Sequence, residues 1–144
     1  MIITFKIINH GSLEYQSAVA LREEILRKPL GLTFLPEELK KEKDSIHVVG
    51  FKGDEVVATA VLVTEGLSCK MRQVSVKADL HGYGIGSKIM AFCEEYAKIQ
   101  GCNYIHCHAR ASSLQFYLKN NYAPNGDYFY EVSIPHIRMS KSLT

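Results

Sequence analysis

The chain has 144 residues, of which 47% are hydrophobic and 22% charged, and its formal net charge is +2. This length fits a single domain over residues 1–144, and the balance of residue types excludes a disordered chain. A charge so close to neutral gives no reason to expect nucleic acid or an acidic membrane as a partner. The first ten residues lack the signature of a secretory leader, and no apolar run is long enough to span a membrane. We therefore expect a cytoplasmic protein.

The first half of the chain predicts a meander of short elements. Residues 2–8 alternate as a strand does, and residues 13–27 form a helix that Ser12 can cap. Residues 36–43 predict a short charged helix, whose Lys40-Lys41-Glu42-Lys43 run we interpret as a solvated face. Three strands follow, with a turn at Gly53-Asp54 between the first two. These strands cover residues 46–52, 55–64 and 68–76.

The second half alternates strands with helices. Its clearest helix covers residues 87–100, where apolar residues recur at helical spacing and Gly101 ends the helix. The remaining elements are a strand over residues 104–109, a helix from Ser112 or Ser113 to about residue 120, and strands over residues 128–132 and 136–140. The order β-α-α-β-β-β-α-β-α-β-β predicts an α+β fold with a mixed sheet.

Residues 74–87, VSVKADLHGYGIGS, carry the most chemical information. They run from a strand through a loop with alternating glycines into the clearest helix. Glycine lets a backbone approach a ligand closely, and the free amides and dipole of a helix start bind phosphate. A P-loop needs Lys before Ser or Thr, but Ser87-Lys88 has the reverse order. The spacing GxGxG also differs from the GxGxxG of dinucleotide sites, so ATP and nicotinamide cofactors are disfavoured.

The run from His81 to Gly86, HGYGIG, resembles the Q/R-x-x-G-x-G/A motif with which the GNAT superfamily of N-acetyltransferases binds the acetyl-CoA pyrophosphate. The segment MRQVSV before it and the helix after it resemble the family's fourth strand and third helix. Downstream, LQFYLKNNY is similar to the family's LxFYxKxGF helix. The segments LREEIL and IPHIRM resemble, more weakly, the ElaA-like branch. The resemblance implies a three-layer fold whose central, mostly antiparallel sheet splays at the strand before the glycine loop.

Two positions depart from the family pattern. His81 stands where Arg or Gln is usual, and a histidine carries only part of a charge at neutral pH. Asn121 replaces the glycine before the last aromatic residue of the downstream helix. Because Asn tolerates the left-handed conformation better than most residues, we expect it to substitute for that glycine.

The resemblance implies acetyl-CoA as co-substrate and several backbone contacts with it. Amides of residues 81–87 would hold the pyrophosphate, and the backbone of Val74 and Val76 would pair with the pantetheine arm as an added strand. An amide near Val74 would polarise the thioester carbonyl. The implied binding residues are Val74, Ser75, Val76, His81, Gly82, Tyr83, Gly84, Ile85, Gly86 and Ser87.

Tyr117 is the implied general acid, because a tyrosine at this position of the family faces the coenzyme sulfur and can protonate the leaving thiolate. Without the resemblance, a core aromatic residue is the simpler interpretation. The attacking amine also needs a base. The candidates are Glu23, Glu24, Glu131, His136 or a water chain.

The remaining reactive residue types have simpler structural explanations. The four cysteines, Cys69, Cys93, Cys102 and Cys107, form no CxxC pair, and we expect free and mostly buried thiols that are not nucleophiles. His106 and His108 share a strand face and could hold a metal with a cysteine. Polar alternation along a half-exposed strand explains them more simply, so no metal is expected.

The predicted function is transfer of an acetyl group from acetyl-CoA to a primary amine by direct attack, without a covalent enzyme intermediate. The alternatives are another acyl-CoA donor, a regulatory module that binds CoA without turnover, and a protein that merely binds phosphate at the glycine loop. The acceptor stays open among polyamines, amino sugars, amino acids, peptide N-termini and lysines. The terminal strands of the sheet could also pair two copies into a homodimer.

Overall fold

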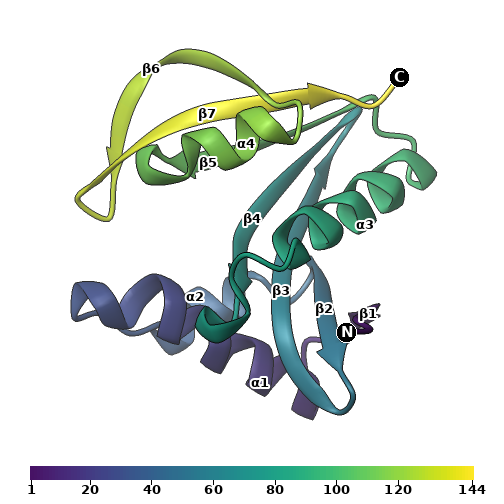
Figure 1. Ribbon diagram of the computed structural model, residues 1–144, viewed down its shortest axis with the longest axis vertical. Coiled ribbons are helices and arrows are strands. Elements are labelled where there is room, and N and C mark those ends of the chain that lie inside the picture. Colours follow the sequence, from purple (N-terminus) through teal and green to yellow (C-terminus); the bar gives the residue numbers. More distant parts are fainter.

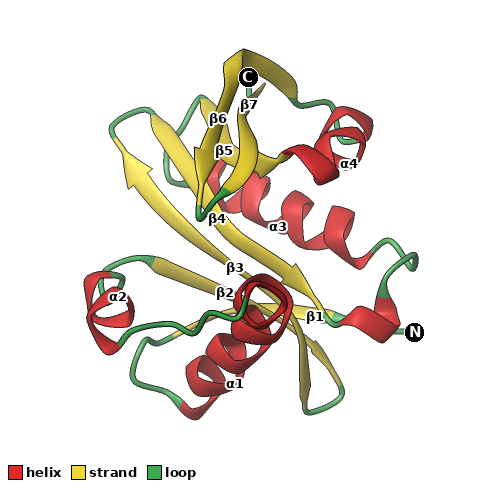
Figure 2. Cartoon of the chain, turned by 90° about the vertical axis from the view of Figure 1, so that its left-hand side faces the viewer, coloured by secondary structure: helices red, strands yellow, loops and turns green.

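The computed structural model describes residues 1–144 as a seven-stranded sheet with helices on both faces (Figures 1 and 2). The strand order is β1-β2-β3-β4-β5-β7-β6, and only the pairing of β4 with β5 is parallel. This confirms the predicted α+β fold with a mostly antiparallel mixed sheet. The strands are β1 (Thr4–Ile8), β2 (Ile46–Lys52), β3 (Glu55–Glu65), β4 (Ser68–Val76), β5 (Tyr104–Arg110), β6 (Ala123–Glu131) and β7 (Ile134–Ser142). The helices are α1 (Leu13–Arg22), α2 (Pro36–Lys41), α3 (Ile85–Ile99) and α4 (Leu114–Lys119).

Strand β3 separates the two helical layers. Its sequence is apolar nearly throughout, as expected of a strand that is covered on both faces. Ala58, Ala60 and Leu62 belong to the main core together with the buried face of α3. Val57 and Val61 point to the opposite face, against which α1 packs.

The sheet divides between β4 and β5. These strands pair only where Ser68–Lys70 lies beside residues 104–106, so the rest of β4 has no partner on that side. Opposite Ala60, β4 carries a bulge in which Gln73 takes the left-handed conformation, with φ of 58°. Figure 1 shows the two parts of the sheet joined near the C-terminus and diverging away from it. The predicted splay at the strand before the glycine loop is therefore confirmed.

Several predicted boundaries differ from the structure, and three of these differences have a local explanation. Helix α3 begins at Ile85 rather than residue 87, because Gly84 takes the N-cap position. Helix α1 is followed by a π-helical turn over Glu23–Arg27 within the range predicted as one helix. Strand β6 begins at Ala123 rather than residue 128, because the turn-forming run Asn125-Gly126-Asp127 forms an irregular part of the strand instead of preceding it.

The run Lys40-Lys41-Glu42-Lys43 at the end of α2 is not wholly solvated. This finding corrects its interpretation as a solvated helix face. Glu42 is only 5% exposed and forms a bidentate ion pair with Arg22, which is 1% exposed, at 2.6 and 3.0 Å. The hydroxyl of Tyr15 also donates to Glu42, at 2.6 Å. The Nε2 of His47 donates to the Glu42 carbonyl at 2.8 Å. This network ties α1 to the segment between α2 and β2.

No helix of the structure is both long and apolar enough to cross a membrane.

We expect Glu42→Gln to lower the free energy of unfolding by about 3 kcal/mol, because it leaves the buried guanidinium of Arg22 without its counter-charge. Burial by itself raises the pKa of Glu42, but the hydrogen bonds from Arg22 and Tyr15 hold that pKa below its ordinary value. A carboxylate with a lowered folded-state pKa stabilises above its unfolded pKa and loses this contribution as the pH falls. Urea unfolding should therefore show a difference between variant and wild type that shrinks below about pH 4.5.

Glu37→Gln is the matched control, because Glu37 is exposed on α2, the helix that ends just before Glu42, and forms no ion pair. Its free energy of unfolding should stay within about 0.5 kcal/mol of the wild type. Equal stability of the Glu42 and Glu37 variants at pH 7 would contradict the structural role of the buried pair.

Candidate active site

The loop between β4 and α3 exposes its backbone. Gly82 and Gly84 have φ of 89° and 78°, which a residue with a Cβ adopts only under strain. Gly84 is the N-cap of α3, so the first amides of this 15-residue helix point out of the loop. At Gly86 a Cβ would lie 3.0 Å from the ring of Phe116, so this glycine allows α3 to pack closely against α4. The local geometry is that of an anion site.

The end of β4 offers one further free amide. Lys77 donates its backbone N–H to the Val57 carbonyl of β3, at 2.9 Å. Successive residues of a strand point to opposite edges, so the backbone groups of Val76 point away from β3, toward the divergence from β5. The Val76 carbonyl accepts a hydrogen bond of 2.7 Å from Nε2 of His81. Its amide is left for a ligand, and one nitrogen of His81 is already engaged.

A cavity of about 480 Å³ lies between this loop, β4 and α4. It is lined by most of the residues expected to bind acetyl-CoA and also by Phe116 and Tyr117. Tyr83 is the exception, because it does not line the cavity and is 62% exposed. The expected residues that do line it are Val74, Ser75, Val76, His81, Gly82, Gly84, Ile85, Gly86 and Ser87.

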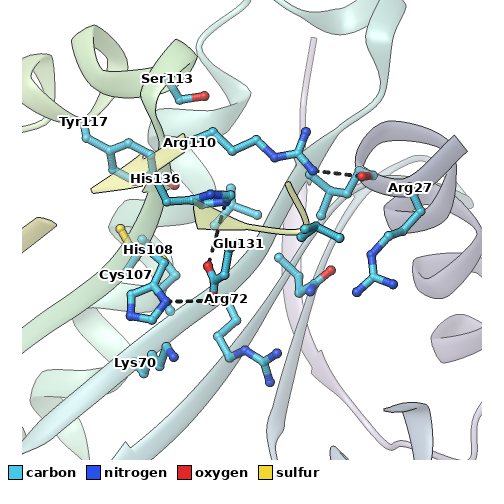
Figure 3. Close-up of a pocket in the computed structure, with 15 residues that line it drawn as sticks. Arg27, Lys70, Arg72, Cys107, His108, Arg110, Ser113, Tyr117, Glu131 and His136 are labelled. Atoms are coloured by element: carbon cyan, nitrogen blue, oxygen red, sulfur yellow. Dashed lines mark hydrogen bonds and ion pairs between the residues drawn. The ribbon is translucent and has the colours of Figure 1, made fainter. Parts of the chain in front are cut away.

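A second cavity, of about 230 Å³, opens between β4, β5, β7 and the π-helical turn (Figure 3). The two cavities meet at five residues, whose side chains or backbone line both. These shared residues are Leu26, Val74, Arg110, Ser113 and Tyr117. Tyr117, the predicted general acid, therefore lines both cavities.

Tyr117 is protonated at neutral pH. Its side chain is 8% exposed, and this burial together with the adjacent Cys107 thiol raises the pKa of the phenol above its ordinary value. The ring is not free of the core, because it contacts Phe116 and Tyr122 edge-on. These contacts fit the interpretation of Tyr117 as a core aromatic residue, and its role as general acid stays a prediction. Its hydroxyl can donate a proton or a hydrogen bond at the junction of the cavities.

Glu131, His108 and His136 form the acid–base cluster of the smaller cavity (Figure 3). Nδ1 of His108 lies 3.0 Å from Oε1 of Glu131, and Nε2 of His136 lies 3.9 Å from Oε2. Nδ1 of His136 donates to the Ile134 carbonyl at 2.8 Å, so a neutral His136 has its Nε2 lone pair on the side of Glu131.

The carboxylate of Glu131 is ionised at neutral pH. Burial alone would raise its pKa, but the hydrogen bond from His108 and the nearby histidines keep the pKa below its ordinary value. The other two carboxylates considered as bases, Glu23 and Glu24, line neither cavity. Of the four side chains considered, only Glu131 and His136 line a cavity that Tyr117 also lines.

The four cysteines are free and buried, as expected. Burial raises the pKa of Cys69 and of Cys107 to about 12, and it raises the pKa of Cys93 still further. A thiol with such a pKa is a poor nucleophile at neutral pH. No three His, Cys, Asp or Glu side chains come together in a group able to hold a metal ion.

The sequence analysis missed several residues of the smaller cavity. Lys70, Arg72, Arg110 and Ser113 line it, and His108 was considered only as a metal ligand. The available signal was the polar alternation of β4 and β5, where Lys70 and Arg72, and likewise His108 and Arg110, stand two residues apart. The sequence does not show that the polar faces of β4 and β5 lie beside each other, because this depends on the order of strands in the sheet.

Comparison with known proteins places the chain in a family. Residues 43–124, more than half of the chain, match the family model of the acetyltransferase (GNAT) domain. YjcF of Bacillus subtilis, described as an uncharacterized N-acetyltransferase, is 24% identical over 94% of this chain and 97% of its own length. YyaT of the same organism is 26% identical over 68% of this chain, and the aligned part spans 66% of YyaT.

Solved structures share the whole fold at low identity. A Lactobacillus plantarum protein superposes over 100% of both chains with a TM-score of 0.88 and 19% identity. ElaA of Escherichia coli has a TM-score of 0.82 and 22% identity over 97% of this chain and 99% of its own. An aminoglycoside 6'-N-acetyltransferase complexed with coenzyme A has a TM-score of 0.80 and 16% identity over 100% of this chain and 98% of its own.

The chain belongs to the GNAT family. It is an acyltransferase of the kind that uses an acyl-CoA as donor and a nitrogen atom as acceptor.

Proposed function

We propose that this protein transfers an acetyl group from acetyl-CoA to a primary amine of a small molecule by direct attack. The observation that carries the proposal is the meeting of two cavities at Tyr117, one lined by the glycine loop and the other by Glu131 and His136. The donor would enter from the first cavity and the acceptor from the second. Because the smaller cavity must receive both acceptor and acyl group, its volume of about 230 Å³ favours an acyl group as short as acetyl.

The donor would be held mainly by backbone groups. The pyrophosphate would accept hydrogen bonds from amides of residues 81–87 at the start of α3. The pantetheine arm would run along the unpaired side of β4, where the Val76 amide points. An amide near Val74, which lines both cavities, would polarise the thioester carbonyl. The CoA complex of the aminoglycoside N-acetyltransferase with the same fold supports this class of donor.

The reaction needs two proton transfers in addition to attack. The amine nitrogen forms a bond to the thioester carbon, and the carbon–sulfur bond breaks as the tetrahedral adduct collapses. Tyr117 would give a proton to the departing sulfur. His136 would take the proton of the amine at Nε2, and the carboxylate of Glu131 would stabilise the imidazolium that forms.

Gly84→Ala tests the phosphate loop. A residue with a Cβ in the left-handed conformation costs about 1–2 kcal/mol, and the loop relieves that strain only by moving away from its native geometry. We expect the Kd of CoA to rise about tenfold in isothermal titration calorimetry. Gly53→Ala is the control, because Gly53 has φ of 62° in the β2–β3 turn with open space around it. The same Kd in both variants would remove the loop from the binding site.

Tyr117→Phe should lower kcat about a hundredfold, because the leaving thiolate loses its proton donor. The Kd of acetyl-CoA should change less than about threefold, since the ring and its packing are retained. The measurement is thiol release from acetyl-CoA with an accepted amine. Tyr122→Phe is the control, because the buried Tyr122 hydroxyl donates to Glu94 at 2.8 Å and lines neither cavity. A Tyr117 variant as active as the Tyr122 variant would end the assignment as acid.

Glu131→Gln should lower kcat/KM for the amine at least about tenfold, because the carboxylate that would stabilise protonated His136 becomes a neutral amide. CoA affinity should not change, since Glu131 lines only the smaller cavity. The same thiol-release assay serves here, with Glu23→Gln as the control. If both variants keep full activity, the proton leaves by another route, such as a water chain.

A further inference from the structure

The smaller cavity carries an excess of positive charge. Its lining contains a single carboxylate, Glu131, which is already engaged by two histidines. The lining cations are Arg27, Lys70, Arg72 and Arg110.

Three of these four cations form no ion pair within the protein. Arg27 is neutralised outside the cavity, where it forms a bidentate pair with Glu38 at 3.3 and 3.0 Å and stacks on Phe34. Lys70, Arg72 and Arg110 form no salt bridge.

The three unpaired cations approach the cavity from neighbouring strands. Lys70 and Arg72 stand two apart on β4, so both side chains lie on one face of the sheet. Arg110 extends from β5 across the cavity, and its Nη2 donates to the Leu26 carbonyl at 2.8 Å. In the view of Figure 3, Arg110 and Arg27 lie at the top and right, Lys70 and Arg72 lie at the bottom, and Glu131 lies near the centre.

Like charges that line one cavity repel one another, and a bound anion would relieve that repulsion. Arg110 is half-buried, and burial together with the charge of Arg27 lowers its pKa below the ordinary value. The pyrophosphate of CoA does not explain Lys70 and Arg72, because neither lines the larger cavity. They lie four to six residues before Val76, and six strand residues span about 20 Å.

We propose that the acceptor is a small amine that also carries an anionic group, a carboxylate or a phosphate ester, which Lys70 and Arg72 bind. The amino group then lies between Glu131 and Tyr117. This inference rests on the proposed transferase function and names the class of its acceptor. A polycationic acceptor, such as the aminoglycoside of the enzyme that shares this fold, would meet repulsion in this cavity.

Matched amines test the inference. Thiol release from acetyl-CoA is measured with O-phosphoethanolamine against ethanolamine, β-alanine against 3-aminopropanamide, and spermidine. We expect kcat/KM at least about tenfold higher for the anionic member of a pair, since each charged contact adds to its binding. The pair with the larger difference identifies phosphate or carboxylate as the anion. Equal or better use of the neutral amines or of spermidine would overturn the inference.

Variants that remove positive charge test whether Lys70 and Arg72 cause the preference for anionic amines. The double variant Lys70→Gln/Arg72→Gln should lose the preference for the anionic amine, so that the ratio of kcat/KM between the anionic amine and its neutral partner falls to about one. Both side chains lie at the surface of the cavity, so the melting temperature should not change. Arg138→Gln is the control. Arg138 lies opposite His108 in the register of β5 and β7, but it does not line the cavity. A preference unchanged in the double variant would overturn the assignment of these residues.

A binding measurement separates this inference from the transferase function. With CoA at saturation the glycine loop is occupied, and the melting temperature is then recorded with each amine. Added stabilisation by an anionic amine in the wild type, absent in the double variant, supports the anion site even if no amine is acetylated. No stabilisation by CoA itself defeats the transferase function. No difference between anionic and neutral amines in this measurement defeats the anion site.

Discussion

The unpaired side of β4 is the feature on which the rest of the site depends. A free strand edge presents backbone donors and acceptors that water or another chain would otherwise occupy. Here it lies inside the molecule, because β5 pairs with β4 over three residues only and then diverges. The glycine loop continues directly from this edge, and Tyr117 faces it from α4. An extended ligand with amide groups can complete the sheet at this position.

Ion pairs help to hold the π-helical turn that lines the smaller cavity with β4. The buried Arg22–Glu42 pair and the Arg27–Glu38 pair fix the segments on either side of the π-helical turn. This turn carries Leu26, whose carbonyl accepts the hydrogen bond of Arg110 from the other part of the sheet. Short π-helical turns are frequent at functional sites because they redirect a helix locally. The same network therefore supports the fold and positions one cation of the acceptor cavity.

Features encoded by adjacent residues were predictable from the sequence. The loop from His81 to Gly86 and the order of elements follow from local patterns, and Asn121 adopts the expected left-handed conformation with φ of 70°. The buried state of Glu42 was not predictable, because its partner Arg22 lies 20 residues away and the run around Glu42 is otherwise exposed. The acceptor cavity was missed for a similar reason. Its cations come from separate strands, and only the sheet order brings them together.

The two cavities differ in construction. The proposed donor site would use mostly backbone groups of one continuous segment, so it would tolerate sequence change as long as the loop keeps its shape. The proposed acceptor site is assembled from side chains of β4, β5, β7 and the π-helical turn. Replacing an exposed side chain such as Arg72 costs little stability, yet it changes the charge that an acceptor meets. The solved structures that superpose on this chain at 16–22% identity share its fold. Under the proposed function, the charges that line the smaller cavity would decide which acceptor binds.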